Sequence, residues 1–197
     1  MTPFTLNAPG LLLDEFRPSD EAAIFEYCQD PLFERFLTLP WPYGVGDAEY
    51  FVREYVPNGW ETGSELTWAL REPNGTFLGV IGLRLPASAL KFWLGAPHRG
   101  NGYMPVAVET VTEWVFSTRF AGITEVHWEC VEGNTASLAV ARKTGFAYAG
   151  VGPATAAGRD GSHPPSWHGV LHRGDDHTPK PGWPSSVRSE NEGDPCL

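Results

Sequence analysis

A glycine-containing turn that leads directly into an amphipathic helix restricts the folding of this chain more than any other segment. Gly100 and Gly102 stand just before a stretch in which apolar residues recur at helical spacing from Met104 to Val115, and this pattern predicts a helix over about 103–120. β-prone segments lie on both sides of that helix. Because a helix that connects two neighbouring strands of one sheet joins them in parallel, the chain is expected to form a sheet with some parallel neighbours.

Short strands and helices are predicted around this unit. Two alternating segments, at 66–71 and 77–85, flank the turn residues Pro73, Asn74 and Gly75, which is typical of a hairpin. The other expected elements are a strand over 11–17, a helix over about 20–30, a helical excursion that ends at Pro57-Asn58-Gly59, strands at 90–94 and 126–131, a helix from Asn134 through Lys143, a strand from Phe146 and a last strand over 167–172. This order predicts an α/β (mixed α+β) fold with a central mixed, mostly antiparallel sheet flanked by helices.

Length and composition limit the class of protein. The 197 residues fit one domain over 1–173, followed by a proline-containing acidic tail over 174–197 that is expected to be disordered. The formal net charge of −10 makes nucleic acid and anionic membranes poor partners. Three widely separated cysteines, Cys28, Cys130 and Cys196, favour a reducing cytoplasm over a disulfide framework or a zinc site. The N-terminus lacks the basic region of a secretion signal, so an unexported protein is expected.

Two segments offer both a chemical and a purely structural interpretation. The turn from His98 to Met104 could hold a diphosphate, because glycines let the backbone approach a ligand and the free N–H groups of a first helical turn favour an anion. It could equally be an ordinary connection between a strand and a helix. In the second segment Asn134 can cap a helix that Gly145 ends, with Ser137 three residues after the cap, and end-capping alone explains that pattern.

Taken together, the two segments resemble the GNAT superfamily of acyl-CoA N-acyltransferases, especially its RimJ/RimL-like branch, over about residues 10–173. The family signature is Arg or Gln, two residues, Gly, one residue, then Gly or Ala. Arg99 and Gly102 match it, and Met104 departs from the strict form. The stretch from Asn134 to Phe146 is similar to the later motif of the family, and residues 38–52 resemble its substrate-side helical segment.

The resemblance implies an acetyl-CoA site without a metal. A main-chain N–H near Leu94 would stabilise the oxyanion, Ser137 would protonate the departing thiolate, and Asn134 would bond pantetheine or an ordered water. The implied cofactor-binding residues are Arg99, Gly100, Asn101, Gly102, Tyr103 and Met104 at the diphosphate, Phe92, Trp93 and Leu94 along pantetheine, and Asn134 and Ser137 beside them.

The sequence leaves the identity of the general base open. An aliphatic amine has a pKa of about 10, so a base must remove its proton. Glu129 leads, and the other candidates are Glu132, His127, Glu109 and His168. Side chains alternate between the two faces of a strand. One face of this strand carries His127, Glu129 and Val131, and the other carries Val126, Trp128 and Cys130. The pattern does not say which face meets the thioester.

Two further features remain ambiguous. Cys130 could be a nucleophile, but a packing cysteine is the expected interpretation, so direct transfer without an acyl-enzyme is predicted. The aromatic cluster with Phe33, Trp41 and Tyr43 could line the acceptor pocket or belong to the core.

The leading prediction is a cytoplasmic acetyl-CoA-dependent N-acetyltransferase, monomeric or homodimeric, that acts on a primary amine of a small molecule. Acetylation of a protein or peptide N-terminal amine is the alternative within the family. A noncatalytic acyl-CoA-binding module is the alternative from another class, since a fold does not fix a function.

Overall fold

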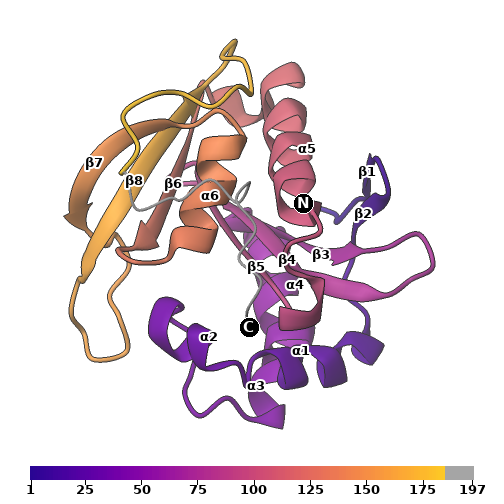
Figure 1. Ribbon diagram of the computed structural model, residues 1–197. Helices are drawn as coiled ribbons and strands as arrows, with labels where there is room; N and C mark the ends of the chain where they lie inside the picture. Colours follow the sequence, from indigo (N-terminus) through magenta and orange to yellow (C-terminus); the bar gives the residue numbers. More distant parts are fainter. Residues whose placement is uncertain (185–197) are drawn as a thin grey trace.

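A central sheet of eight strands organises the computed structural model, which describes residues 1–184 (Figure 1). Its strand order is β1-β2-β3-β4-β5-β6-β8-β7. The strands are β1 (Leu6–Ala8), β2 (Leu11–Asp14), β3 (Glu65–Arg71), β4 (Phe77–Arg84), β5 (Ala89–Leu94), β6 (Glu125–Val131), β7 (Ala147–Pro153) and β8 (Pro165–His172). The helices are α1 (Glu21–Tyr27), α2 (Pro31–Phe36), α3 (Val45–Tyr50), α4 (Val56–Thr62), α5 (Tyr103–Ser117) and α6 (Thr135–Lys143), with short helical turns at Pro18–Asp20, Phe51–Tyr55, Ala96–His98 and Phe120–Gly122.

The sheet is mixed and mostly antiparallel, as predicted. β5 and β6 form its one parallel pair within residues 1–184, and α5 is the crossover between them. β8 lies between β6 and β7 and pairs antiparallel with both. The predicted hairpin is β3 and β4. The expected strands at 90–94, 126–131 and 167–172 and the helices at 103–120 and 134–143 are confirmed, with ends that shift by a few residues.

Helices cover the two faces of the sheet differently. On one face, here called the α5/α6 face, Val108 and Val111 of α5 and Leu138 of α6 are buried against Leu90 and Trp128 of the sheet. The opposite α1–α4 face holds a second core, in which Ile24, Phe33 and Ala48 pack with Ala69 and Val80. Figure 1 shows α5 and α6 side by side and α1–α4 gathered at the other end of the molecule.

The helical excursion was predicted to end at Pro57-Asn58-Gly59, and this boundary is wrong. α4 continues through Pro57 to Thr62 and ends at Gly63, which has φ +67°. A π-helical turn at Phe51–Tyr55 comes directly before α4. Because that turn already interrupts the regular hydrogen-bond ladder, the N–H that proline lacks falls near the start of a new helical segment, where it is tolerated.

One strand boundary and one additional strand also differ from the prediction. The first strand ends at Asp14 rather than at residue 17, and β1, which was not predicted, pairs with it across a turn at Gly10. A strand of three residues is too short to give a periodic signal.

The segment after β8 differs from the expected tail in its first part. Within 175–184, Lys180 forms an ion pair with Asp175, and the Trp183 ring lies 5.9 Å from Trp128 and 5.3 Å from Tyr148 between ring centroids. One docked tryptophan can order a segment whose average composition is polar. Residues 185–197 lie outside the described residues, and disorder there stays a prediction.

Candidate active site

The candidate site lies where β5 and β6 stop pairing. These strands pair only at Ala89 with His127 and at Leu90 with Trp128. Beyond that point β5 remains paired with β4 up to Leu94, and β6 remains paired with β8 up to Val131. The facing edges of 91–94 and 129–131, here called the open edges, therefore keep main-chain groups that no neighbouring strand uses.

The register shows which main-chain groups these are. Gly95 N donates to Leu78 O, and hydrogen-bonded pairs alternate along an antiparallel ladder, so Trp93 and Lys91 bond to β4. Phe92 and Leu94 consequently direct their N–H groups away from β4 toward the open edge. On the other side, Glu132 N donates to Pro165 O, so Glu129 and Val131 direct theirs away from β8. The two edges suit an extended ligand with amide groups, such as a pantetheine arm.

The turn before α5 has the geometry of an anion site. Gly100 and Gly102 both have φ +79°, and a Cβ added at either would meet no atom within 4 Å. Gly102 is the N-cap of α5, so the N–H groups of Tyr103 and Met104 have no partner within the helix, Pro105 has no N–H, and the helix dipole adds a partial positive charge. Met104 is buried in the core and can contribute only main-chain groups.

The polar side chains of this turn are held by the protein itself. Arg99 donates through Nε to Leu94 O at 3.1 Å and forms an ion pair with Asp30 at 2.6 Å. Asn101 donates to His98 O and Arg99 O, and the Tyr103 hydroxyl donates to Glu72. These side chains hold the turn together, so its main-chain N–H groups are the polar groups left for a ligand.

Ser137 and Asn134 lie at the start of α6, next to β6 on the α5/α6 face. Asn134 Oδ1 accepts from Ser137 N at 3.2 Å, which is a helix cap. Ser137 Oγ accepts from Trp128 Nε1 at 3.1 Å. The Asn134 oxygen therefore has a structural partner, whereas the Ser137 hydroxyl still has its own proton to donate.

Cys130 lies beside these two residues. Its Sγ is 3.6 Å from Asn134 O. Burial raises the pKa of its thiol to about 12, although a hydrogen bond with Ser137 opposes part of that effect. A thiol with that pKa is protonated at neutral pH and is a poor nucleophile.

Glu129 lies on the opposite, α1–α4 face of the sheet. Thr155 donates to this carboxylate through both its hydroxyl, at 2.6 Å, and its main-chain N–H, at 3.1 Å. His168, its partner in the β6–β8 register, places Nδ1 3.6 Å from Glu129 Oε2. The Glu129 side chain is 27 % exposed, so its carboxylate is held in place and still reaches solvent.

The other base candidates have less suitable positions. His127 lies 3.2 Å from Glu125 and is exposed. Glu132 is exposed beyond the end of β6, and Glu109 lies in the second turn of α5. Of the residues considered, Glu129 and His168 are the two whose side chains meet.

The predicted aromatic residues fall into two groups. Phe33 and Tyr43 are buried in the core of the α1–α4 face, where Phe33 packs edge-on against Trp93 at 5.4 Å. Burial raises the pKa of the Tyr43 hydroxyl. Trp41 is only half-buried, so of the three it is the one with substantial surface left for an acceptor.

The loop between β7 and β8, residues 154–164, also lies on the α1–α4 side of the site. The sequence analysis did not predict its contacts there. Arg159 donates to Leu37 O at 2.9 Å, to Leu39 O at 3.0 Å and to Glu34 O. Figure 1 shows the loop reaching toward α2. A lone arginine in a polar loop gives no sequence signal of a contact across more than a hundred residues.

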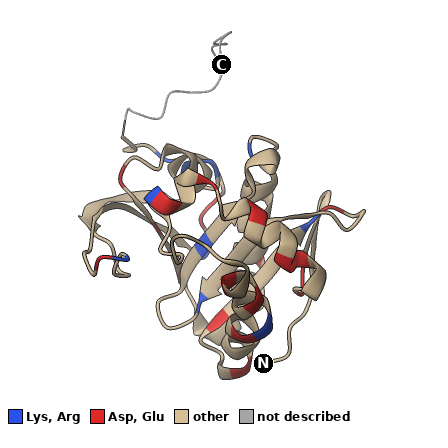
Figure 2. Ribbon diagram, turned by 90° about the horizontal axis from the view of Figure 1, so that it is seen from below, with Lys and Arg blue, Asp and Glu red and all other residues tan. Residues whose placement is uncertain are grey.

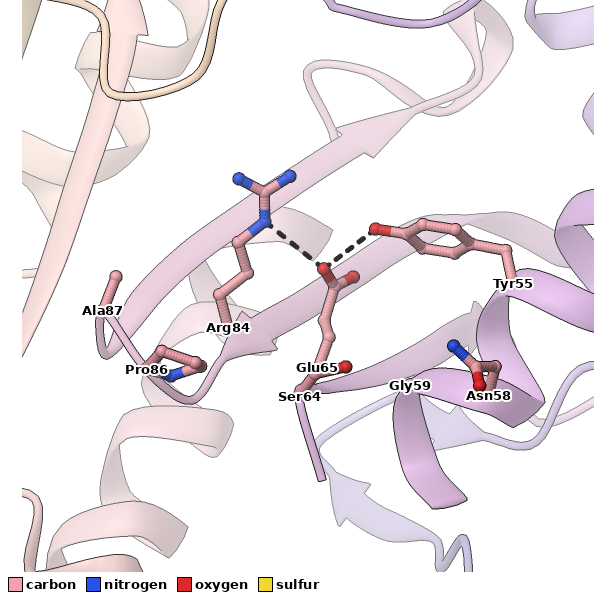
Figure 3. Close-up of a pocket in the computed structure, with 8 residues that line it drawn as sticks. All are labelled: Tyr55, Asn58, Gly59, Ser64, Glu65, Arg84, Pro86 and Ala87. Carbon is pink, nitrogen blue, oxygen red and sulfur yellow. Dashed lines mark hydrogen bonds and ion pairs between the residues drawn. The ribbon is translucent and has the colours of Figure 1, made fainter. Parts of the chain in front are cut away.

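A mostly apolar pocket of about 280 Å³, here called the Glu65 pocket, borders the start of β5 on the same face (Figure 3). Glu65 at its floor forms ion pairs with Lys91 at 2.5 Å and Arg84 at 3.3 Å, and Tyr55 donates to it at 3.0 Å. Burial opposes ionisation, but the Lys91 charge and these hydrogen bonds hold the pKa of Glu65 below its usual value. The lining residues are Tyr55, Asn58, Gly59, Ser64, Glu65, Arg84, Pro86 and Ala87. No sequence motif predicted this cluster.

Charged residues are spread over the molecule. Figure 2 shows basic residues scattered among more numerous acidic ones in that view. Within the described residues, no helix is long and apolar enough to cross a membrane, and no group of three or more His, Cys, Asp or Glu side chains could hold a metal ion.

Comparison with known proteins agrees with this geometry. Residues 10–147 match the family model described as an acetyltransferase (GNAT) domain, and no curated protein matches the chain. Among solved structures, RimL, a ribosomal L7/L12 alpha-N-protein acetyltransferase in complex with coenzyme A, has 17 % identity and a TM-score of 0.71, with 86 % of this chain and 98 % of that chain covered.

Two other solved structures are similar in fold. The microcin C7 self immunity acetyltransferase MccE, in complex with acetyl-CoA and AMP, has 17 % identity and a TM-score of 0.69, covering 83 % of this chain and 92 % of that one. RimJ from Mycobacterium smegmatis has 16 % identity and a TM-score of 0.70, covering 86 % of each chain.

Proposed function

The chain belongs to the GNAT acetyltransferase family and is an acetyl-CoA-dependent acetyltransferase, and from that premise we propose that it transfers the acetyl group directly to a primary amine of a small molecule. The observation that carries this proposal is the short pairing of β5 and β6. It leaves open edges between Ser137 on one face of the sheet and Glu129 on the other, so a thioester held there is reachable from both faces.

Main-chain groups would hold the cofactor in this proposal. The N–H groups at the start of α5, after Gly100 and Gly102, would bind the diphosphate. The open edges at Phe92 and Leu94 would pair with pantetheine, and one of those two N–H groups would stabilise the oxyanion. The Arg99 side chain, tied to Leu94 O and Asp30, would hold the turn and the end of β5 in register.

Side chains would carry the proton transfers. Glu129, fixed by Thr155, would accept the proton of the attacking amine on the α1–α4 face. Ser137 would donate its hydroxyl proton to the departing sulfur on the α5/α6 face. The high pKa of the Cys130 thiol supports direct attack over a route through an acyl-cysteine.

Acetylation of a protein or peptide N-terminal amine is the second candidate. Its support is the similarity in fold to RimL, which is described as a ribosomal L7/L12 alpha-N-protein acetyltransferase. An acidic surface suits a cationic acceptor of either kind. We further propose that the protein acts in the cytoplasm as a monomer or homodimer. It would need no nucleic acid, membrane or metal.

The test is an acceptor panel with acetyl-CoA. Small amines, diamines and peptides with free N-termini are incubated with the protein, while free thiol and acetylated products are followed by mass. We expect acetylation of a small primary amine with one thiol released per product. Acetylation of peptides alone would favour the second candidate, and tight CoA binding with no product from any acceptor would favour a binding module.

A further inference from the structure

The Trp128 indole restricts the direction of the Ser137 hydroxyl. An indole N–H can only donate, so at 3.1 Å Trp128 Nε1 occupies a lone pair of Ser137 Oγ. The proton of that hydroxyl must then point away from the indole. The acceptor beside it is the Cys130 thiol, which is weak.

Other hydroxyls on helices of this protein behave differently. Thr110, Thr112 and Thr144 donate to the main-chain carbonyl four residues earlier, at 2.8–3.0 Å. In such a bond the hydroxyl proton is donated to the main chain and is not available to a ligand. Ser137 lies in the first turn of α6, where the residue four positions earlier, Gly133, is outside the helix. Within residues 1–184 the Ser137 hydroxyl makes no hydrogen bond to a main-chain carbonyl, so its proton is available to a ligand, and the indole excludes one of its directions.

We propose that Trp128 is a positioning residue for the general acid: by donating to Ser137 Oγ it aims the hydroxyl proton toward the CoA sulfur and makes that proton a stronger hydrogen-bond donor. This inference rests on the proposed role of Ser137. Hydrogen bonds in a chain polarise one another, so a hydroxyl that accepts from an N–H donates more strongly to a thiolate.

The segment after β8 supports the indole from the far side. The Trp183 ring packs against Trp128 with centroids 5.9 Å apart and an interplanar angle of 62°. It also packs against Tyr148 at 5.3 Å. Trp128 has an exposed fraction of 2 %, so its ring is confined between these neighbours and α6. Trp183 thus lies outside the residues matched by the family model and still contacts the residue that holds the acid.

The test measures the pKa of the CoA thiol bound to the full-length protein, which needs no acceptor. The protein is held in excess over CoA, iodoacetamide is added across a pH series, and alkylated CoA is counted by mass, separately from the protein cysteines. A thiol has a pKa of about 8.5 in water. We expect a lower value in the wild-type complex, because a donated hydrogen bond stabilises the thiolate.

Three variants separate the contributions. Ser137→Ala is expected to raise the pKa of the bound thiol by about one unit, the size of one hydrogen bond to a charged group. Trp128→Phe, which retains an aromatic ring and removes the N–H, is expected to give about half of that shift. Trp68→Phe is the control, because it removes a buried indole donor whose acceptor is Phe4 O instead, and it should leave the thiol pKa unchanged.

The outcomes distinguish the two levels of the argument. No shift in Ser137→Ala would remove Ser137 from the sulfur, and the proposed acid role would fail together with this inference. A shift in Ser137→Ala with none in folded Trp128→Phe would overturn the inference alone. In the double variant Trp128→Phe should add nothing to Ser137→Ala, and an additive shift would also overturn it.

Discussion

The two faces of the sheet present different kinds of groups to the open edges between β5 and β6. Toward the cofactor, the protein offers main-chain N–H groups of Phe92, Leu94 and the first turn of α5. On the α1–α4 face, where the acceptor is proposed to bind, it offers the Glu129 side chain together with a loop tied by Arg159. Under the proposed function, cofactor recognition would therefore depend on backbone geometry, and acceptor recognition would depend on contacts between distant segments.

The largest expected effect is on the cofactor side. Gly102→Val should weaken CoA binding by at least about a hundredfold, because it forces a β-branched residue to φ +79° and adds bulk where phosphates would approach. Calorimetry with CoA measures this loss. Gly10→Val is a matched control, since Gly10 also has a positive φ and open space but lies in the β1–β2 turn. Equal CoA affinity for Gly102→Val and wild type would refute the assignment of the turn.

The next effect concerns the reaction on the α5/α6 face. Ser137→Ala should lower kcat by roughly a hundred- to ten-thousandfold with little change in CoA affinity. The cap of α6 uses the Ser137 main-chain N–H and survives the change, but the buried Trp128 Nε1 loses its acceptor, so the melting temperature should fall by a few degrees and is measured beside the rate. Steady-state kinetics with the acceptor found in the panel measures the rate. Unchanged kcat in the folded variant would exclude Ser137 from the mechanism.

On the acceptor face, Glu129→Gln should lower the rate at neutral pH by roughly tenfold or more, near the low end of the range for a general base. The loss should shrink as the pH approaches about 10, where a free amine is abundant. A pH profile of kcat/KM for both proteins checks this. A variant with the same profile as wild type would mean that Glu129 is a structural carboxylate held by Thr155.

The smallest effect is expected in the segment after β8, which packs against the α5/α6 face through Trp183. A protein that ends at residue 184 should melt like the full chain. One that ends at Gly174 should lose a few degrees, because it lacks Trp183 and the Lys180–Asp175 ion pair. Thermal unfolding of both truncated proteins measures the difference, and identical melting temperatures would show that the docked Trp183 contributes no net stability.

The same division explains how much could be predicted from the sequence. The turn at Gly100 and Gly102, the helix after it and the cap at Asn134 are local patterns, and the structure has them at the predicted positions. The contacts of Arg159 with Leu37 O and of Arg99 with Asp30 join segments far apart in the chain. No local spacing encodes such pairs, because they depend on how the whole sheet brings its loops together.

Tertiary packing also decided the details that local patterns left open. Period two gave the faces of β6, but only the packing of Trp128 in the core of the α5/α6 face shows that Glu129 lies on the other side. Pro57 is a helix-ending signal when considered alone, and the π-helical turn before it overrides that signal.

Hydrogen–deuterium exchange with and without CoA tests the division between the faces most directly. The account predicts that CoA slows exchange at the amides of Phe92 and Leu94 on β5 and at those of residues 100–104, while the amides of residues 33–43 exchange as before. Slower exchange around Glu65 and Arg84, in the Glu65 pocket, with no change at 92–94 and 100–104, would contradict it.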